Sequence, residues 1–338
     1  MKDGPSVLVC GYGSIGRRHL GNLRMLGVRR LSVFRTGLGS LDLDDSDGMR
    51  IHHDLGEALA QRPDGVVVSN PTSLHLETAM AAAEAGCAIL LEKPISHSAE
   101  GIRDFQRMVQ SKGLPVLVGF QFRFHPSLRI VRMWIREGRI GPLVAIEAHY
   151  GEHLPSWHPW EDFRKGYSAR IDLGGGVVLT LCHPLDIMRW LAGEARRVSA
   201  LAANLSGLGI EAEDAAAAVI RFDSGAIGNV SVNYYEKPAS HWVRVTGRAG
   251  TISWDGLSGR AVLSTEQATE TFEPGRAFER NTMFLSEMSH FLDCVSGASM
   301  PVCTLVDGIR ALELALAIKQ AALGGKEIGI DGTDGLRE

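Results

Sequence analysis

The sequence has few cysteines, no long apolar run and no excess of basic charge. Its five cysteines are scattered, odd in number and without a CxxC pair, so the sequence predicts free thiols in a reducing cytosol rather than disulfides or a structural zinc site. No apolar run reaches the roughly 20 residues that a bilayer-spanning helix needs. The N-terminal stretch lacks the pattern of a signal peptide. We therefore expect a cytoplasmic protein with no membrane partner.

The formal net charge of -4 excludes a broad basic field, so nucleic acid is not expected as a main partner. Hydrophobic residues make up 45% of the chain and charged residues 22%, the profile of an ordinary globular protein. A chain of 338 residues exceeds what one compact core usually holds. Two domains are therefore predicted.

From residue 6 to about 122, short apolar runs alternate with helical patterns. This alternation predicts a doubly wound α/β fold, in which helices cover both faces of a parallel sheet. The predicted strands are 6–10, 31–34, 65–69, 88–91 and 115–120. The predicted helices are 14–26, 54–60, 74–85 and 99–112.

After residue 122 the pattern changes to one helix over 126–141, a strand over 143–154 and closely spaced strands later on, typical of an antiparallel sheet. Two helices close the chain, the second beginning where Thr304 and Asp307 have capping-box spacing. We predict a Rossmann domain over 1–122 and, over 123–338, an α+β domain for substrate binding and oligomerisation, with a large open, mostly antiparallel sheet. An alternative for the two closing helices is that they pack against the first domain.

The first predicted strand runs directly into G-x-G-x-x-G, which opens the first helix. This motif provides a tight turn at the first glycine, close approach of a pyrophosphate at the second and close packing of helix on strand at the third. The helix N-terminus adds free N–H groups for phosphate. The alternative is a plain strand-to-helix turn. The predicted cofactor-binding residues of the loop are Gly11, Tyr12, Gly13, Ser14, Ile15 and Gly16.

The end of the second predicted strand bears on the choice of dinucleotide. NAD sites usually place a carboxylate there for the ribose hydroxyls, whereas this chain has Arg35 and Thr36 and no acid until Asp42. An arginine suits a 2′-phosphate, so NADP is favoured and NAD is possible. The alternative is a solvated surface arginine. We also predict cofactor contacts at Asn70, Pro71 and His75.

Two further motifs carry reactive side chains. Glu92, Lys93 and Pro94 follow the fourth predicted strand, at the edge where open α/β sheets bind ligands. A run of three glycines leads later into a helix that bears His183 and Asp186. Taken singly, the first motif is typical of a surface loop and the second of a core histidine.

Together, "GYGSIGRRH", "EKP" and "GGGVVLTLCHPLD" resemble the Gfo/Idh/MocA family of sugar and cyclitol oxidoreductases over nearly the whole chain. The resemblance implies a nicotinamide cofactor and hydride transfer at a carbinol carbon. It implies that Lys93 hydrogen-bonds the reacting hydroxyl and helps to seat the nicotinamide, and that His183 exchanges the hydroxyl proton. Many members have an aspartate four residues before this histidine, where this chain has Leu179. The resemblance also implies a homodimer or homotetramer formed through the second sheet.

The segment 149–170 is dense in aromatic and basic residues and predicts a substrate-binding lip. The alternatives are a surface loop packed on its aromatics, or metal binding by His149, His153 and His158, against which Gly151 and Pro155 argue because they disfavour a helix. Arg123 suits either the cleft or packing between domains. The predicted substrate-binding residues are Arg123, Trp157, Arg164, Tyr167, Arg170 and Asp186.

The leading hypothesis is an NAD(P)-dependent dehydrogenase or reductase acting on a secondary alcohol or ketone of a sugar, sugar derivative or nucleotide sugar. No metal is predicted in the site. Two alternatives share the fold: an NAD-dependent glycoside hydrolase and a non-catalytic cofactor-binding regulator. Retention of both Lys93 and His183 argues against the regulator.

Overall fold

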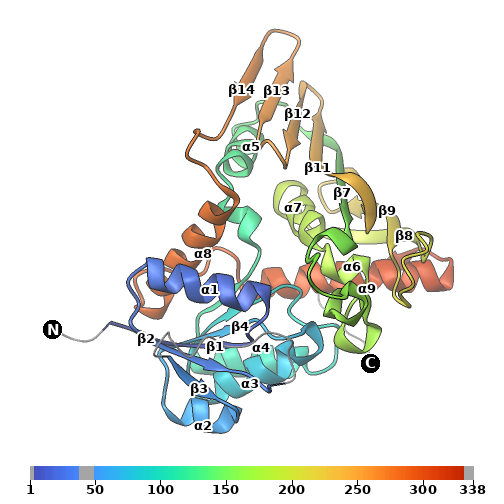
Figure 1. Cartoon of the computed structure of the whole chain (residues 1–338). Coiled ribbons are helices and arrows are strands. Elements are labelled where there is room, and N and C mark those ends of the chain that lie inside the picture. Colours follow the sequence, from blue (N-terminus) through green and yellow to red (C-terminus); the bar gives the residue numbers. More distant parts are fainter. Residues whose placement is uncertain (1–3, 38–48, 331–338) are drawn as a thin grey trace. The chain divides into compact units, whose positions relative to one another are not determined.

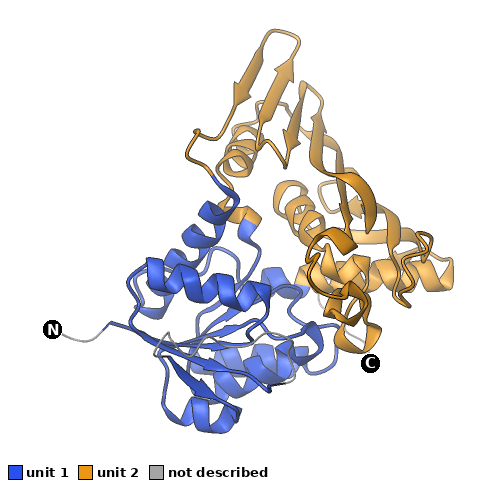
Figure 2. Cartoon of the chain, in the orientation of Figure 1, with its two compact units in different colours: residues 1–121, 279–309 blue, residues 122–278, 310–338 orange. Residues whose placement is uncertain are grey.

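The computed structural model describes residues 4–37 and 49–330 of the chain. The chain divides into two compact units, each with its own β-sheet (Figures 1 and 2). Unit 1 contains residues 1–121 and 279–309, and unit 2 contains residues 122–278 and 310–338. Neither unit is therefore one continuous stretch of sequence.

Unit 1 contains a sheet of six parallel strands in the order β3-β2-β1-β4-β5-β6. From β1 the chain adds β2 and β3 on one side of that strand and then β4, β5 and β6 on its other side. The strand order therefore reverses between β1 and β4, and open α/β sheets bind ligands at such a point. All residues of β4 and β5 are buried, as in a sheet covered on both faces. The strands are β1 (Ser6–Cys10), β2 (Arg30–Phe34), β3 (Arg50–His52), β4 (Gly65–Val68), β5 (Ala88–Leu91) and β6 (Val116–Val118).

Five helices in the described part of unit 1 flank this sheet. Two of them, α1 (Ser14–Met25) and α8 (Arg280–Val295), contact each other on one side of the sheet (Figure 1). On the other side α3 (His75–Glu84) contacts both α2 (Leu55–Ala60) and α4 (Ile102–Lys112). The late segment that contains α8 thus completes the first unit.

Unit 2 contains a nine-stranded sheet in the order β14-β13-β12-β11-β7-β10-β9-β8-β15. Its neighbours are antiparallel except β7 and β10, which run parallel. The strands are β7 (Leu143–His153), β8 (Ala195–Ala203), β9 (Ala215–Phe222), β10 (Ile227–Asn233), β11 (Tyr235–Gly247), β12 (Gly250–Asp255), β13 (Ala261–Thr265), β14 (Thr269–Phe272) and β15 (Ile328–Gly329).

Helices cover one face of the nine-stranded sheet. α7 (His183–Ala192) contacts β7 and β10, and α6 (Val177–Thr180) contacts β9 and β10. α5 (Pro126–Arg136) contacts β12 and β13. The last helix, α9 (Leu305–Gly324), begins in unit 1 and continues into unit 2. Along β9 buried and exposed residues alternate, so the opposite face of the sheet is exposed.

The predicted fold class is confirmed: a parallel Rossmann sheet precedes a mostly antiparallel one. The predicted capping box is present, because Asp307 accepts hydrogen bonds from the backbone N–H and the hydroxyl of Thr304, each at 2.8 Å. β3 and β8 were not predicted.

Within the described ranges no single helix is long and apolar enough to cross a membrane; only the bent pair 171–180 and 183–192 passes that test together. The residues of α6 and α7, which belong to this pair, are nearly all buried in unit 2.

Candidate functional site

The glycine loop of unit 1 lies between the end of β1 and the start of α1. Gly11 has a φ of +107°, and a Cβ there would lie 2.7 Å from the backbone of Ser69 and Asn70. A Cβ on Gly16 would overlap the carbonyl oxygen of Gly11. Gly13, which caps α1, has open space in front of it, and no side chain caps the helix. The loop therefore offers the cradle and the bare helix N-terminus that a pyrophosphate requires.

The ends of β4 and β5 are joined by His75. Its ring nitrogens lie 2.7 Å from the carbonyl oxygen of Pro94 and 2.8 Å from that of Asn70. Burial, opposed by the hydrogen bond to Pro94, lowers the pKa of this histidine. The Asn70 side chain donates to Thr78 Oγ1 at 2.8 Å. His75 therefore fixes the Asn70–Pro71 turn against the EKP loop; direct cofactor contacts by these residues stay predictions.

At the end of β2 the guanidinium of Arg35 lies over the ring of Tyr12, 5.9 Å from its centroid. Arg35 thus stands next to the glycine loop, half-buried, and Thr36 beside it is exposed. Asp42, the first acid after this strand, lies outside the described residues.

Lys93 follows β5 and is half-buried, with a cis peptide bond to Pro94. Its backbone N–H donates to the Glu92 carboxylate at 3.2 Å. The same carboxylate lies 2.7 Å from Nε2 of His19, on α1. The side chain of Glu92 thus ties Lys93 to the helix that follows the glycine loop. A direct contact between Glu92 and a cofactor stays a prediction.

In unit 2, His183 is the first residue of α7 and is 7% exposed. Its ring packs edge-on against Phe122, with centroids 5.0 Å apart. Leu179, four residues before His183, is buried in α6. This packing holds the imidazole ring in place, and histidine is the side chain best suited to exchange a proton near neutral pH.

Arg123 and Asp186 form a buried two-pronged ion pair. Arg123 donates from Nε to Oδ2 at 2.9 Å and from Nη2 to Oδ1 at 2.6 Å, and the Arg189 guanidinium lies 3.8 Å from Oδ1. Both side chains are at most 4% exposed. The pair therefore joins the segment before α5 to α7; direct contact of either residue with a substrate stays a prediction.

The predicted lip consists of irregular and 3-10 turns between β7 and α6. Trp157 packs edge-on against Tyr234. Its buried Nε1 has no hydrogen-bond partner within the described part of the chain. Tyr167 is 37% exposed. Arg164 and Arg170 are both exposed and each pairs with an aspartate two positions away, Asp162 and Asp172.

The histidines weighed as metal ligands have different neighbours. His149 lies 2.6 Å from both Ser231 Oγ and a Glu236 oxygen, whereas His153 lies 2.6 Å from Ser156 Oγ. The buried group of His19, Glu92 and Glu287 in unit 1 was not predicted from the sequence. One available signal was a glutamate inside the apolar stripe of α8.

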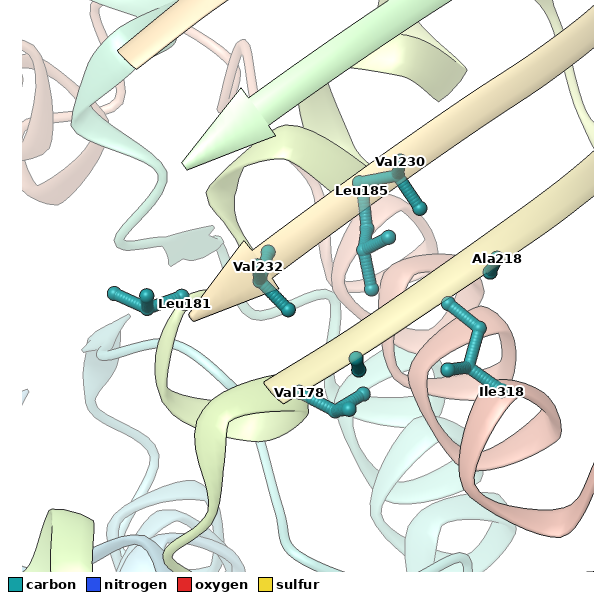
Figure 3. Close-up of a pocket in the computed structure, with 8 residues that line it drawn as sticks. Val178, Leu181, Leu185, Ala218, Val230, Val232 and Ile318 are labelled. Carbon is teal, nitrogen blue, oxygen red and sulfur yellow. The ribbon is translucent and has the colours of Figure 1, made fainter. Parts of the chain in front are cut away.

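A small pocket of unit 2 lies between α6, α7, β9, β10 and α9 (Figure 3). Its walls are aliphatic throughout, so it suits core packing better than catalysis. None of the predicted site residues lines it. The lining residues are Val178, Leu181, Leu185, Ala216, Ala218, Val230, Val232 and Ile318.

Comparison with known families agrees with both units. Residues 6–120 match the oxidoreductase family with an NAD-binding Rossmann fold, and residues 128–253 match the GFO/IDH/MocA C-terminal domain. The chain belongs to the Gfo/Idh/MocA family. It is an NAD(P)-dependent oxidoreductase, and the predicted family and enzyme class are confirmed.

Characterised relatives act on sugars and cyclitols. Scyllo-inositol 2-dehydrogenase (NAD(+)) of Bacillus subtilis (strain 168) is 29% identical over 276 residues, which cover 79% of this chain and 78% of that protein. The 1,5-anhydro-D-fructose reductase of Ensifer adhaerens is 27% identical over 277 residues, which cover 79% and 80%.

Solved structures share the fold over almost the whole chain. Levoglucosan dehydrogenase in complex with NADH has a TM-score of 0.85 at 18% identity, covering 97% of this chain and 99% of that one. The WlbA dehydrogenase from Bordetella pertussis, in complex with NADH and UDP-GlcNAcA, has a TM-score of 0.81 at 23% identity, covering 97% and 99%. At these identities the likeness shows the fold alone.

Proposed function

We propose that the protein transfers a hydride between a nicotinamide dinucleotide and a secondary alcohol or ketone of a sugar, a sugar derivative or a nucleotide sugar. The observation that carries this proposal is the glycine cradle of unit 1 together with Lys93 at the same edge of the sheet. Unit 1 is the dinucleotide-binding unit and unit 2 supplies the substrate-binding residues. The names of the relatives support the substrate class.

Gly11, Gly13 and Gly16 hold the pyrophosphate at the N-terminus of α1 in this proposal. When bound, the nicotinamide supplies or accepts the hydride. Lys93 donates a hydrogen bond to the reacting oxygen and stabilises the negative charge that develops there. Its half-buried position supports this role, as does the backbone hydrogen bond that ties Lys93 to the Glu92 carboxylate.

His183 exchanges the proton of the reacting hydroxyl in this mechanism. Carbon releases a hydride only as its oxygen loses a proton, so a base with a pKa near neutrality is needed, and it typically contributes about 10²–10⁴-fold. The ring of His183 is 7% exposed and packs against Phe122, which supports a fixed orientation of the imidazole for this exchange. Since Leu179 has no proton to exchange, His183 performs this task without an aspartate four residues before it, the residue that the family resemblance implies for many members.

NADP is the proposed cofactor, with NAD as the second choice. The position of Arg35, at the end of β2 and stacked near Tyr12, supports a contact with a 2′-phosphate. The proposed substrate carries an anionic group, which would replace Asp162 and Asp172 as the partners of Arg164 and Arg170 on the exposed lip.

We also propose a cytoplasmic homodimer or homotetramer. All five cysteines are buried and none forms a disulfide, which suits a reducing compartment. The uncovered face of the nine-stranded sheet carries exposed apolar side chains on several strands, which supports oligomerisation through that face. They include Leu201 on β8, Val219 on β9, Ile227 on β10 and Trp242 on β11.

Steady-state turnover with a panel of sugars, sugar acids and nucleotide sugars tests the function, with NADPH and NADH absorbance as the readout. We expect net oxidation or reduction of the cofactor with at least one substrate. Copurification of NAD, with glycosidic cleavage and no net absorbance change, would assign the protein to the hydrolases of this fold instead. Cofactor binding without any turnover would support a regulator.

A further inference from the structure

Three ionisable side chains meet in the interior of unit 1, from three different elements. His19 comes from α1, Glu92 follows β5 and Glu287 lies in the middle of α8. One ligand-type atom of each lies within 4.8 Å of the other two. His19 and Glu287 are fully buried and Glu92 is 5% exposed. Three such groups in one solvent-free place require a defined arrangement of protons and charge.

Glu92 has the partners of an ionised carboxylate. Nε2 of His19 lies 2.7 Å from one oxygen, and the backbone N–H of Lys93 donates to the other. Burial by itself raises the pKa of Glu92, but the hydrogen bond and attraction of His19, with the charges of Lys93 and His75, lower it below its ordinary value. The negative charge of the cluster therefore resides on Glu92.

Glu287 has the opposite surroundings. Neither of its carboxyl oxygens has a hydrogen-bond partner within residues 4–37 and 49–330. Burial, together with the charge of nearby Glu92, raises the pKa of Glu287 well above its usual range. Two carboxylates this close and this deep cannot both ionise at low cost.

We propose that Glu92 and Glu287 hold one negative charge and one proton between them, that Glu287 keeps the proton, and that the charge fixed on Glu92 by His19 positions Lys93. His19 and Glu287 are thus positioning residues. This inference rests on the proposed function only for the role of Lys93; the protonation of Glu287 stands apart from it.

In the proposed reaction, the cluster couples the position of Lys93 to that of α1. Glu92 is held between α1 and the backbone of Lys93, so a shift of α1 is transmitted to the lysine. The Glu92 carboxyl group occupies the space in front of Gly119, where the Cβ of any other residue would come within 3.1 Å of it. A second ionised carboxylate would repel Glu92; a protonated Glu287 keeps the cluster compact.

Infrared difference spectroscopy at neutral pH tests the proton directly, using the full-length protein. We expect the carbonyl band of a protonated carboxyl group in the wild type and its loss in Glu287→Gln. The control Glu100→Gln removes an exposed carboxylate of unit 1 and should leave the band in place. A wild-type spectrum without this band would overturn the proposal.

Unfolding measured against pH gives a second readout. Because the folded state keeps a proton that the unfolded chain releases, the wild type loses stability relative to Glu287→Gln as pH rises above the ordinary glutamate range, by up to about tenfold in the unfolding constant per pH unit. Glu287→Met, also uncharged, should behave like Glu287→Gln. Parallel curves for wild type and both variants would contradict a protonated Glu287.

Metal analysis and kinetics complete the test. A stoichiometric divalent cation, bound by wild type and lost in Glu287→Gln, would overturn the shared proton because the cation would then neutralise the carboxylates. In an active enzyme, Glu92→Gln should move the alkaline limb of the pH profile to lower pH, since Lys93 loses its opposite charge. An unmoved limb would overturn the link to Lys93, while total inactivity of the wild type would refute only the proposed reaction.

Discussion

Gly16 lies directly beneath the carbonyl oxygen of Gly11, so close that a Cβ on Gly16 would overlap that oxygen. The two residues bring the start of α1 against the end of β1, and only glycine permits this approach. This close approach, and not the G-x-G-x-x-G pattern alone, places the N-terminus of α1 where it can bind a phosphate group.

The substitution Gly16→Ala should therefore weaken binding of both nicotinamide cofactors by at least about tenfold, because the loop must move to admit the methyl group. Nicotinamide fluorescence titration measures this. The control is Gly21→Ala in the same helix, where a Cβ meets nothing within 4 Å. It should keep cofactor affinity and stabilise α1 by about 0.5–1 kcal/mol. Equal affinities in the two variants would contradict the account.

Arg35→Ala should lower affinity for NADPH and leave affinity for NADH nearly unchanged, since only NADPH carries the 2′-phosphate. A hydrogen bond to a charged group is worth about 1.5–3 kcal/mol, so a loss of about 10–100-fold is expected. Parallel titrations with the two cofactors measure it, with the exposed Arg29→Ala as the control. A loss that is the same for both cofactors would remove the argument for NADP.

Lys93→Met should reduce kcat by at least about 10²-fold while cofactor binding stays close to wild type, because the lost ammonium stabilises charge on the reacting oxygen. Lys112→Met removes an exposed lysine at the end of α4 and should retain activity. Steady-state rates and fluorescence titrations of both variants distinguish a catalytic loss from a binding loss. Turnover of Lys93→Met at the wild-type rate would refute the role.

Unit 2 should lose stability in acid through His125. Burial lowers the pKa of this side chain to about 4, against an ordinary value near 6.5. The unfolded chain takes up the proton first, so stability is fully present above pH ~6.5 and falls as the pH drops toward 4, by up to about 3 kcal/mol. Thermal unfolding across this range measures the slope. His125→Asn should flatten it, and an unchanged slope would exclude His125 as its source.

Removing one partner of the Arg123–Asp186 pair should destabilise unit 2 by about 3–5 kcal/mol, since the remaining charge stays buried. Arg123→Met, Asp186→Leu and the double variant form a cycle measured by denaturant unfolding. The double variant should be more stable than the sum of the single losses predicts, although Arg189 near Asp186 moderates the effect. Additive losses would show that the pair is not coupled.

The sequence predicted the buried strands best. β1 and β5 match their predicted ranges, because apolar residues at every position are what a doubly covered parallel strand needs. β3 was missed because it is only three residues long and two of them are Arg50 and His52, so it shows no run of apolar residues. β8 was missed because its small and charged residues lack the β-branched composition of the other strands.

The site was predictable only where a local motif carries it. The glycine loop and the EKP loop combine a strand end with a turn, which a sequence displays directly. The pairing of Arg123 with Asp186 and of His19 with Glu92 joins residues 63 and 73 positions apart, which no local pattern encodes. Glu287 is recognisable only as an acid on a buried helix face.

Titration of the purified protein with NADPH and NADH, followed by nicotinamide fluorescence, tests the central claim most directly. The account predicts saturable binding of one nicotinamide dinucleotide per chain, tighter for NADPH, and its loss in Gly16→Ala. Failure of both cofactors to bind at millimolar concentration would contradict it.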